Sequence, residues 1–362
     1  MVLRVATFNV ENLFDRPKLL NIEDQDKASN LLKQFDQLQK ELKKPQYDKA
    51  RIKALLVTLK GYVTIRVDAG TFFKTKGGGP VVATGPNDWL GAIDFTRAKF
   101  DDGQRKNTAA AIKKIDADIM CMIEVEGRQS MSDFSQEYLS GNHRYAFNML
   151  IDSPNDPRGI DVGLQWKTGT LGKLRSNAYD TAKIDGKTKR VFSRDCLEVE
   201  IELTSSKSIV LLCNHFKSKM GGDTPESQAK REAQAKRVAK IAQERYDLER
   251  DFVVVLGDLN DVPSSTPLRP LMNASGLHEV FGLTGRAQDD RWTYYYKGAK
   301  TQIDYIFVSE ALKDKISDVH VWRQGMSAVA EGDVQGITPL PGIHGWRDAA
   351  SDHAAISIDL KI

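Results

Sequence analysis

The stretch from Phe252 to Asp261 places residues capable of acid–base or metal chemistry directly after an apolar run. Five apolar residues end at Leu256, and Gly257, Asp258 and Asn260 follow. An acid and an amide two residues apart project to the same side of an extended chain. Together they could hold a hydrated cation or a water nucleophile. The structural alternative is an acidic turn that does no more than cap a strand.

Polar side chains also stand at the ends of other apolar segments. The full set comprises Asn9, Glu11, Glu124, His215, Asp258, Asn260, Asp304, Asp352 and His353. Polar residues at strand ends are candidate site residues in open α/β sheets, although each alone could be a solvated turn residue. Nine at the ends of successive strands is not what solvated loops would produce. We therefore interpret them as parts of one site.

The donor types in this set favour a hard divalent cation. Carboxylate and amide oxygens without a cysteine or histidine cluster fit Mg²⁺, or Mn²⁺, better than Zn²⁺. Cys121, Cys196 and Cys213 lie inside apolar runs and indicate reduced core thiols. Asp352 immediately before His353 suggests an imidazole that nearby carboxylates orient or charge. No Ser-His-Asp spacing or phosphate-binding glycine loop competes with this interpretation.

Three further features bear on the substrate. Lys217 and Lys219 follow His215 closely, which suits a phosphate group but is also common on solvated surfaces. The aromatic run Trp292–Tyr296 could stack nucleic-acid bases or pack in the core. Asp304 lies within an apolar run, where a charge without a partner is costly to bury, so we expect it to face a polar site.

Strands must carry these residues to one place. We predict strands over Leu3–Val10, Ala117–Ile123, 158–167, Val191–Leu203, Ser208–Asn214, Phe252–Leu256, Thr301–Ser309 and Ala354–Leu360. We predict helices over Gln104–Ile115 and Glu226–Arg250. The second of these helices lies between two predicted strands and makes a strand–helix–strand unit.

Residues from about 16 to 102 are different in character. Apolar residues at helical spacing predict one helix that stops before Pro45 and a second that ends near Gly61, and Tyr62–Val67 alternates like a strand. This segment is too structured for a linker and too long for an ordinary loop. We predict a single domain over residues 1–362 with an insertion at about 16–102.

Composition is that of an ordinary soluble globular protein. The chain has 362 residues, 41% apolar and 28% charged. With 52 basic and 49 acidic residues the net charge is +3, so a nucleic-acid partner would need a local basic face. No apolar run is long enough for a membrane span, and the start lacks the apolar segment of a signal peptide. We expect a cytoplasmic monomer.

The order of the polar motifs resembles the endonuclease/exonuclease/phosphatase superfamily, which has the DNase I-like fold. The motifs are Phe8-Asn9, Ile123-Glu124, Asn214-His215, Gly257-Asp258-Leu259-Asn260, Ile303-Asp304-Tyr305 and Ser351-Asp352-His353. They span the chain from the first strand to the last, outside the insertion. The resemblance implies an α/β fold, a four-layer α/β/β/α sandwich of two packed mixed β-sheets flanked by helices, with the site at one rim.

The resemblance also implies a role for each residue. Glu124, helped by Asn9, would hold the divalent cation. Glu11 and Asp352 would be further metal ligands, although the family pattern has an acid one carbon shorter at the position of Glu11. Asp258 and Asn260 would activate the attacking water. His353, held by Asp304, would hydrogen-bond the scissile phosphate, and His215 would act on the leaving-group side. Arg194, Asn9 and Lys217 would bind substrate phosphate.

These roles predict a Mg²⁺-dependent phosphodiesterase, with DNA or RNA as the leading substrate. A histidine at position 215, Arg194 and the nearby lysines favour a nuclease. The alternative is a phosphoinositide phosphatase or sphingomyelinase-like phosphodiesterase of the same fold. The sequence has neither an apolar membrane-docking loop nor a clear inositol-phosphate signature. The intact set of metal and base residues argues against an inactive binding protein.

Overall fold

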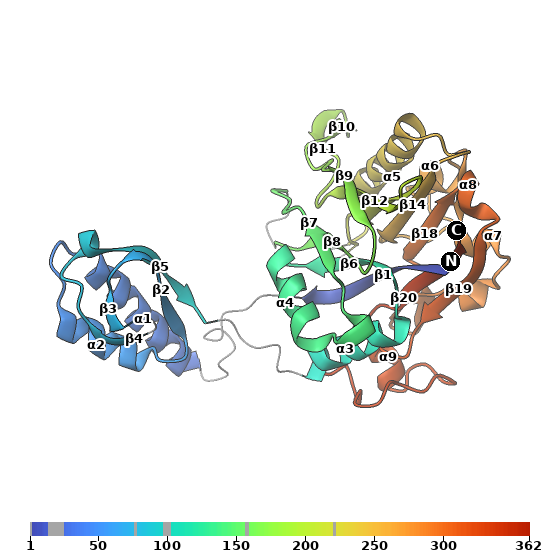
Figure 1. Ribbon diagram of the computed structural model, residues 1–362. Helices are drawn as coiled ribbons and strands as arrows, with labels where there is room; N and C mark the ends of the chain where they lie inside the picture. The colour runs from blue at the N-terminus through green and yellow to red at the C-terminus, as the bar shows by residue number, and fades with distance from the viewer. Residues whose placement is uncertain (1, 14–24, 76–77, 97–102, 156–158, 220–221) are drawn as a thin grey trace. The chain divides into compact units, whose positions relative to one another are not determined.

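The computed structural model describes residues 2–13, 25–75, 78–96, 103–155, 159–219 and 222–362 (Figure 1). The chain forms two compact units. Unit 1 combines Met1–Phe14 with Asp102–Ile362, and unit 2 is Asp15–Asp101. Each unit has a hydrophobic core of its own.

Two six-stranded sheets form the centre of unit 1. The first has the order β19 (Ile316–Trp322), β20 (Ala355–Lys361), β1 (Val2–Leu13), β6 (Ile119–Val125), β8 (Asp161–Trp166) and β7 (Phe147–Leu150). The second has the order β15 (Leu277–Glu279), β18 (Asp304–Ser309), β14 (Phe252–Asp258), β13 (Lys207–His215), β12 (Cys196–Thr204) and β9 (Thr170–Arg175). Both are mixed, because β1 runs parallel to β6 and β13 parallel to β14, whereas their other partners are antiparallel.

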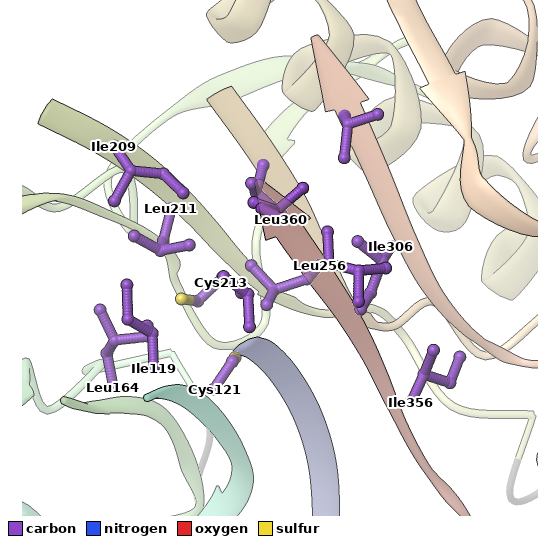
Figure 2. Close-up of a cluster of buried hydrophobic side chains, with 14 of the residues drawn as sticks. Ile119, Cys121, Leu164, Ile209, Leu211, Cys213, Leu256, Ile306, Ile356 and Leu360 are labelled. Carbon is purple, nitrogen blue, oxygen red and sulfur yellow. The ribbon is translucent and has the colours of Figure 1, made fainter. Parts of the chain in front are cut away.

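The main core lies between the two sheets, as Figure 2 shows. Ile119 and Leu164 of the first sheet face Leu211 and Leu256 of the second, and all four are fully or almost fully buried. Alternate residues of each strand point into this layer because side chains alternate across a strand. Cys121 and Cys213 belong to the same layer, and all three cysteines are free and buried. This confirms the prediction of reduced core thiols.

Helices cover the outer faces of the sheets. The helix α5 (Pro225–Arg245) packs its apolar residues on the outer face of the second sheet, beside α6 (Arg269–Met272). It begins where the Thr224 side chain accepts a hydrogen bond from the Ser227 backbone N–H. On the first sheet, α4 (Arg128–Tyr138) packs against β6 and β7. The architecture is the four-layer DNase I-like sandwich of two mixed sheets flanked by helices.

The remaining elements of unit 1 are short or peripheral. They are α3 (Gly103–Ile115), the hairpins β10 (Thr181–Ile184) with β11 (Lys187–Arg190) and β16 (Tyr294–Tyr296) with β17 (Ala299–Thr301), the helices α7 (Val280–Leu283), α8 (Glu310–Lys313) and α9 (Ser327–Ala330), and 3₁₀ turns at Gly141–His143 and Gln288–Asp290. In the described ranges, no helix is both long and apolar enough to cross a lipid bilayer.

Unit 2 contains two helices and two small sheets. Its elements are α1 (Gln25–Leu42), α2 (Lys49–Thr58), β2 (Val63–Gly70), β3 (Phe73–Thr75), β4 (Gly78–Val81), a 3₁₀ turn at Pro86–Asp88 and β5 (Trp89–Phe95). The strand β2 pairs with β5, and β3 pairs with β4. The two expected helices and the strand after Gly61 are present.

Several predicted boundaries were wrong. The strand expected from Val191 begins only at Cys196, because the Val191 N–H bonds the Asp180 carbonyl and the Phe192 carbonyl bonds Asn155 instead of a strand partner. The helix expected to reach Arg250 ends at Arg245. The strand expected over residues 301–309 is two elements, β17 and β18, and Asp304 begins the second. Position 158, expected to begin a strand, lies outside the described residues.

Candidate active site

Most of the predicted site residues meet around one cavity of unit 1. The cavity has a volume of about 680 Å³. It is lined by Asn9, Glu11, Glu124, His215, Ser218, Lys219, Asp258, Asn260, Val262, Tyr294, Tyr296, Ala299, Thr301, Ile303, Asp352 and His353. The parallel pairs β1–β6 and β13–β14 deliver their carboxyl ends here, so residues far apart in the sequence converge at one rim of the sandwich.

Three of the lining residues have left-handed backbone conformations. Glu11, Glu124 and Asn260 have φ angles of 51°, 67° and 54°. Such a conformation costs a residue other than glycine about 1–2 kcal/mol, and this strain is often found at functional sites. At Glu124 the pairing shifts, since Ile123 opposes Val162 while the next paired residue, Val125, opposes Asp161. Glu124 is thus the extra residue of a bulge, which turns its carboxylate out of the buried strand pattern.

Gly257 precedes Asp258 at the end of β14. Its φ is 137°, and a Cβ there would lie 1.9 Å from the backbone oxygen of Asn214 on the neighbouring strand. Only glycine fits such a contact. The sequence Gly257-Asp258 therefore allows β14 to stay paired with β13 up to the edge of the cavity.

Asp258 is a buried carboxylate held by amide donors. It is 2% exposed. Its Oδ2 accepts hydrogen bonds from Asn9 Nδ2 at 3.2 Å and Asn260 Nδ2 at 3.1 Å, and its Oδ1 accepts from the Asn260 N–H at 2.8 Å. Burial, and then the negative charge of Asp304, raise the pKa of Asp258 to about 8. The group is a proton acceptor of unusual strength for a carboxylate.

His353 forms a buried pair with Asp304. The His353 Nδ1 lies 2.8 Å from Asp304 Oδ2. Burial alone would lower the pKa of His353, but the charges of Asp304 and Asp352 raise it well above its ordinary value. Ser351 fixes the backbone beside it, because its hydroxyl accepts from the His353 N–H and donates to the Asn9 carbonyl. This raised pKa favours the protonated form of the imidazole, which lines the cavity.

Several carboxylates share the same cavity. Burial, and then Asp352, raise the pKa of Glu11 to about 7, and Glu124 adds to the effect. The His215 Nε2 lies 3.7 Å from both Glu124 Oε1 and Asp258 Oδ2. Because like charges held together are destabilising, this set of oxygen donors fits a hard divalent cation.

A separate group of possible ligands includes Asp258, Asp304 and His353. Asp304 Oδ1 is buried and has no hydrogen-bond partner among the described residues. Ligand atoms of Asp258, Asp304 and His353 also lie within 4.8 Å of one another, a group that could hold a metal ion. In that group, Asp304 Oδ2 and His353 Nδ1 already form a hydrogen bond with each other.

Arg194 and Lys217 do not line the cavity, and their contacts with substrate phosphate stay a prediction. Arg194 is 2% exposed, and its guanidinium donates to the carbonyl of Phe216, the residue after His215. The Lys217 Nζ donates to the Ser218 carbonyl, and its backbone N–H donates to Gln234 of α5. The lysine that lines the cavity is Lys219, whose Nζ lies 2.6 Å from Asp261 Oδ1.

Sequence reasoning left open one part of this site. The run Trp292–Tyr296 was expected either to stack bases or to pack in the core. Trp292 is buried, whereas Tyr294 and Tyr296 line the cavity. Residues two apart in a strand share one face, and this spacing was the signal in the sequence that Tyr294 and Tyr296 lie side by side. Ser351, which joins the backbones of His353 and Asn9, was seen only as part of a motif.

The sequence matches the model of the Endonuclease/Exonuclease/phosphatase family over residues 90–335, well over half of the chain. The chain belongs to this family. Membership implies hydrolysis of phosphate ester bonds, and enzymes of the family generally use a divalent metal. No curated protein matches the sequence.

Solved structures share the family fold at low sequence identity. The endonuclease/exonuclease/phosphatase from Bacteroides vulgatus is 12% identical with a TM-score of 0.52, and the alignment covers 100% of this chain and 99% of that one. TDP2 from D. rerio, humanised by 14 mutations, is 13% identical with a TM-score of 0.51, covering 72% of this chain and 92% of that one. At these identities the likeness supports the fold alone.

Proposed function

We propose that this protein is a Mg²⁺- or Mn²⁺-dependent phosphodiesterase that hydrolyses nucleic acid. One observation carries the proposal. A buried carboxylate with raised pKa, Asp258, and an imidazole with raised pKa, His353, line the same cavity as the carboxylates of Glu11, Glu124 and Asp352. A proton acceptor, a cationic donor and a set of hard oxygen ligands are what metal-assisted attack of water on a phosphodiester requires.

Glu124 and Asn9 would hold the cation, with Glu11 and Asp352 as further ligands. The bulge at Glu124 and the left-handed backbone at Glu11 support this assignment, because they direct both carboxylates into the cavity. When bound, the cation supplies positive charge to the phosphate oxygens that become more negative in the transition state.

Asp258 and Asn260 would prepare the attacking water. Asp258 Oδ2 lies between two amide donors, Asn9 and Asn260, which fix the direction of its lone pairs. With a pKa raised to about 8, the ionised carboxylate accepts a proton from water more readily than an ordinary aspartate. Asn260 is held by its own contact to Asp258 and would orient the water through its amide.

His353 and His215 would act on the phosphate. The Asp304 carboxylate keeps the imidazole of His353 charged and oriented, and this leaves Nε2 to donate a hydrogen bond to a nonbridging oxygen. His215, beside Glu124 and Asp258, would donate on the leaving-group side. Lys219 adds positive charge at the rim, which favours a polyanionic substrate.

The two-unit organisation supports one further proposal. We propose that residues 15–101 are an insertion into a single endonuclease/exonuclease/phosphatase domain, since the units have separate cores. Cytoplasmic location and a monomeric state stay predictions from the sequence.

A substrate panel tests the function. Plasmid, linear duplex and single-stranded DNA, RNA, a phosphoinositide and sphingomyelin are each incubated with the protein in Mg²⁺, in Mn²⁺ and in EDTA. We expect cleavage of a nucleic acid that EDTA abolishes. Hydrolysis of either lipid with no nucleic acid cleaved would contradict the proposal, as would cleavage that persists in EDTA.

A further inference from the structure

Two tyrosines form an aromatic surface at the edge of the cavity. Tyr294 and Tyr296 lie two residues apart in β16, so their side chains share one face of the hairpin. Their rings are nearly parallel, at 18°, with centroids 6.5 Å apart. Both line the cavity, and Tyr296 is 58% exposed. The proposed hydrolysis gives these two rings no task.

This surface begins at the proposed catalytic centre. The Tyr294 ring lies 4.9 Å from the His353 ring, and the backbones of the two residues form a bridge. From there the aromatic face continues to Tyr296. A group attached next to a phosphate held at His353 would therefore meet the tyrosine rings.

Positive charge accompanies the aromatic face. The Lys297 Nζ lies 5.2 Å from the centroid of the Tyr296 ring. Aromatic rings beside lysines are the combination that holds the bases and backbone of single-stranded nucleic acid.

We infer that Tyr294 and Tyr296 are a stacking surface for an unpaired nucleobase next to the scissile phosphate, so that single-stranded nucleic acid is the preferred substrate class. This inference rests on the proposed function. Bases in a duplex already stack on their neighbours and do not offer a free face, whereas an unpaired base does. The phosphate that follows the stacked base would lie near Lys297.

Binding of labelled oligonucleotides tests the inference separately from catalysis. The probes are a single-stranded oligodeoxyadenylate, the same backbone with abasic residues, and the corresponding duplex. Binding is measured by fluorescence anisotropy in Mg²⁺ in an Asp258→Asn background, so that hydrolysis does not consume the probe. The variants are Tyr296→Leu, which removes the ring, and Tyr296→Phe, which keeps it.

Tyr179→Leu is the matched control. Tyr179 is also exposed, with Arg190 4.5 Å from its ring centroid, but it lines a different cavity beside the β10–β11 hairpin. It therefore repeats the chemistry of Tyr296 and Lys297 away from the proposed catalytic centre.

We expect Tyr296→Leu to weaken binding of the base-containing single strand about 10-fold. Tyr296→Phe and Tyr179→Leu should leave it unchanged. The abasic probe should bind weakly to the parent protein and equally to Tyr296→Leu. Unchanged binding of the oligodeoxyadenylate to Tyr296→Leu would overturn the inference, as would equal losses for the base-containing and abasic probes or tighter binding of the duplex. Failure of the proposed function would appear elsewhere, as the absence of Mg²⁺-dependent nucleic-acid cleavage by the unmodified protein.

Discussion

The pair of His353 and Asp304 gives the sharpest prediction about mechanism. Replacing Asp304 by asparagine keeps the size of the side chain and an oxygen that can accept from His353 Nδ1, but it removes the negative charge. Asp304 is the first of the charges that raise the pKa of His353. We therefore expect the pKa of His353 to fall toward its ordinary value of about 6.5, while Asp352 and Asp258 still raise it.

The size of the effect follows from the protonated fraction of His353. At a pKa of about 6.5, roughly three quarters of the imidazole is charged at pH 6, but only about 3% at pH 8. A raised pKa keeps the imidazole charged over this range in the parent protein. The variant should therefore lose little activity at pH 6 and up to about 30-fold at pH 8 through this cause alone, the largest loss being reached if the pKa falls to about 6.5.

The assay is kcat/KM for the best nucleic-acid substrate, measured in Mg²⁺ from pH 5.5 to 9. Glu310→Gln is the matched control, because Glu310 pairs with His278 at 2.5 Å and neither residue lines the cavity. The control should keep the parent profile. The reasoning is refuted if Asp304→Asn loses the same factor at pH 6 and pH 8, since a uniform loss would report damaged structure instead of lost charge.

Three other predictions follow from the site and the two-unit fold. Glu124→Gln should lower Mg²⁺-dependent turnover by about 10²–10³-fold and abolish the rise in melting temperature on Mg²⁺ addition; a parent-like Mg²⁺ titration would remove Glu124 from the proposed metal site. Without metal, the raised pKa values of Asp258 and Glu11 mean that the folded state binds more protons than the unfolded state between about pH 4 and 8. Stability in EDTA should therefore fall as pH rises through this window, less so in Asp258→Asn, and Mg²⁺ should oppose the fall; melting temperatures that rise equally with pH in both proteins would contradict this. Replacing residues 15–101 by a short glycine–serine linker should leave unit 1 folded, because its core residues all lie outside that segment, and should change the substrate profile more than the melting temperature. Loss of cooperative unfolding would show that unit 1 depends on unit 2.

The layers of the fold could be predicted because the strands that build them are strongly apolar. Val253–Leu256 is buried on both faces in the second sheet, as its continuous apolar run indicates. Strand ends were less predictable. Residues 191–195 have the composition of a strand, but their backbone groups bond Asp180 and Asn155 in tertiary contacts that no local pattern reveals.

The convergence of the candidate site was predictable for a different reason. Polar residues at the carboxyl ends of strands meet wherever the strands run parallel, and Asn9, Glu124, His215 and Asp258 all meet in this way. Arg194 shows the limit of this reasoning. Its guanidinium donates to the Phe216 carbonyl, and the residue does not line the cavity. The direction of a side chain in a loop depends on packing, which a motif does not encode.

The sequence pattern also did not predict the direction of the Glu124 side chain. Alternation along an apolar strand predicts a buried or solvent-facing acid, whereas the bulge and the left-handed backbone turn this carboxylate into the cavity. Likewise, the strand pattern of Tyr294 and Tyr296 was visible, but their position beside His353 requires the bridge between β16 and the segment before β20.

The central claim is that Asp258 activates water for metal-dependent phosphodiester hydrolysis. The most direct measurement is the initial rate of nucleic-acid cleavage in Mg²⁺ by the parent protein and by Asp258→Asn, with folding of both checked by their circular dichroism spectra. We predict cleavage by the parent that EDTA abolishes, and a folded variant at least 10²-fold slower. Cleavage by Asp258→Asn at a rate close to that of the parent would contradict the account.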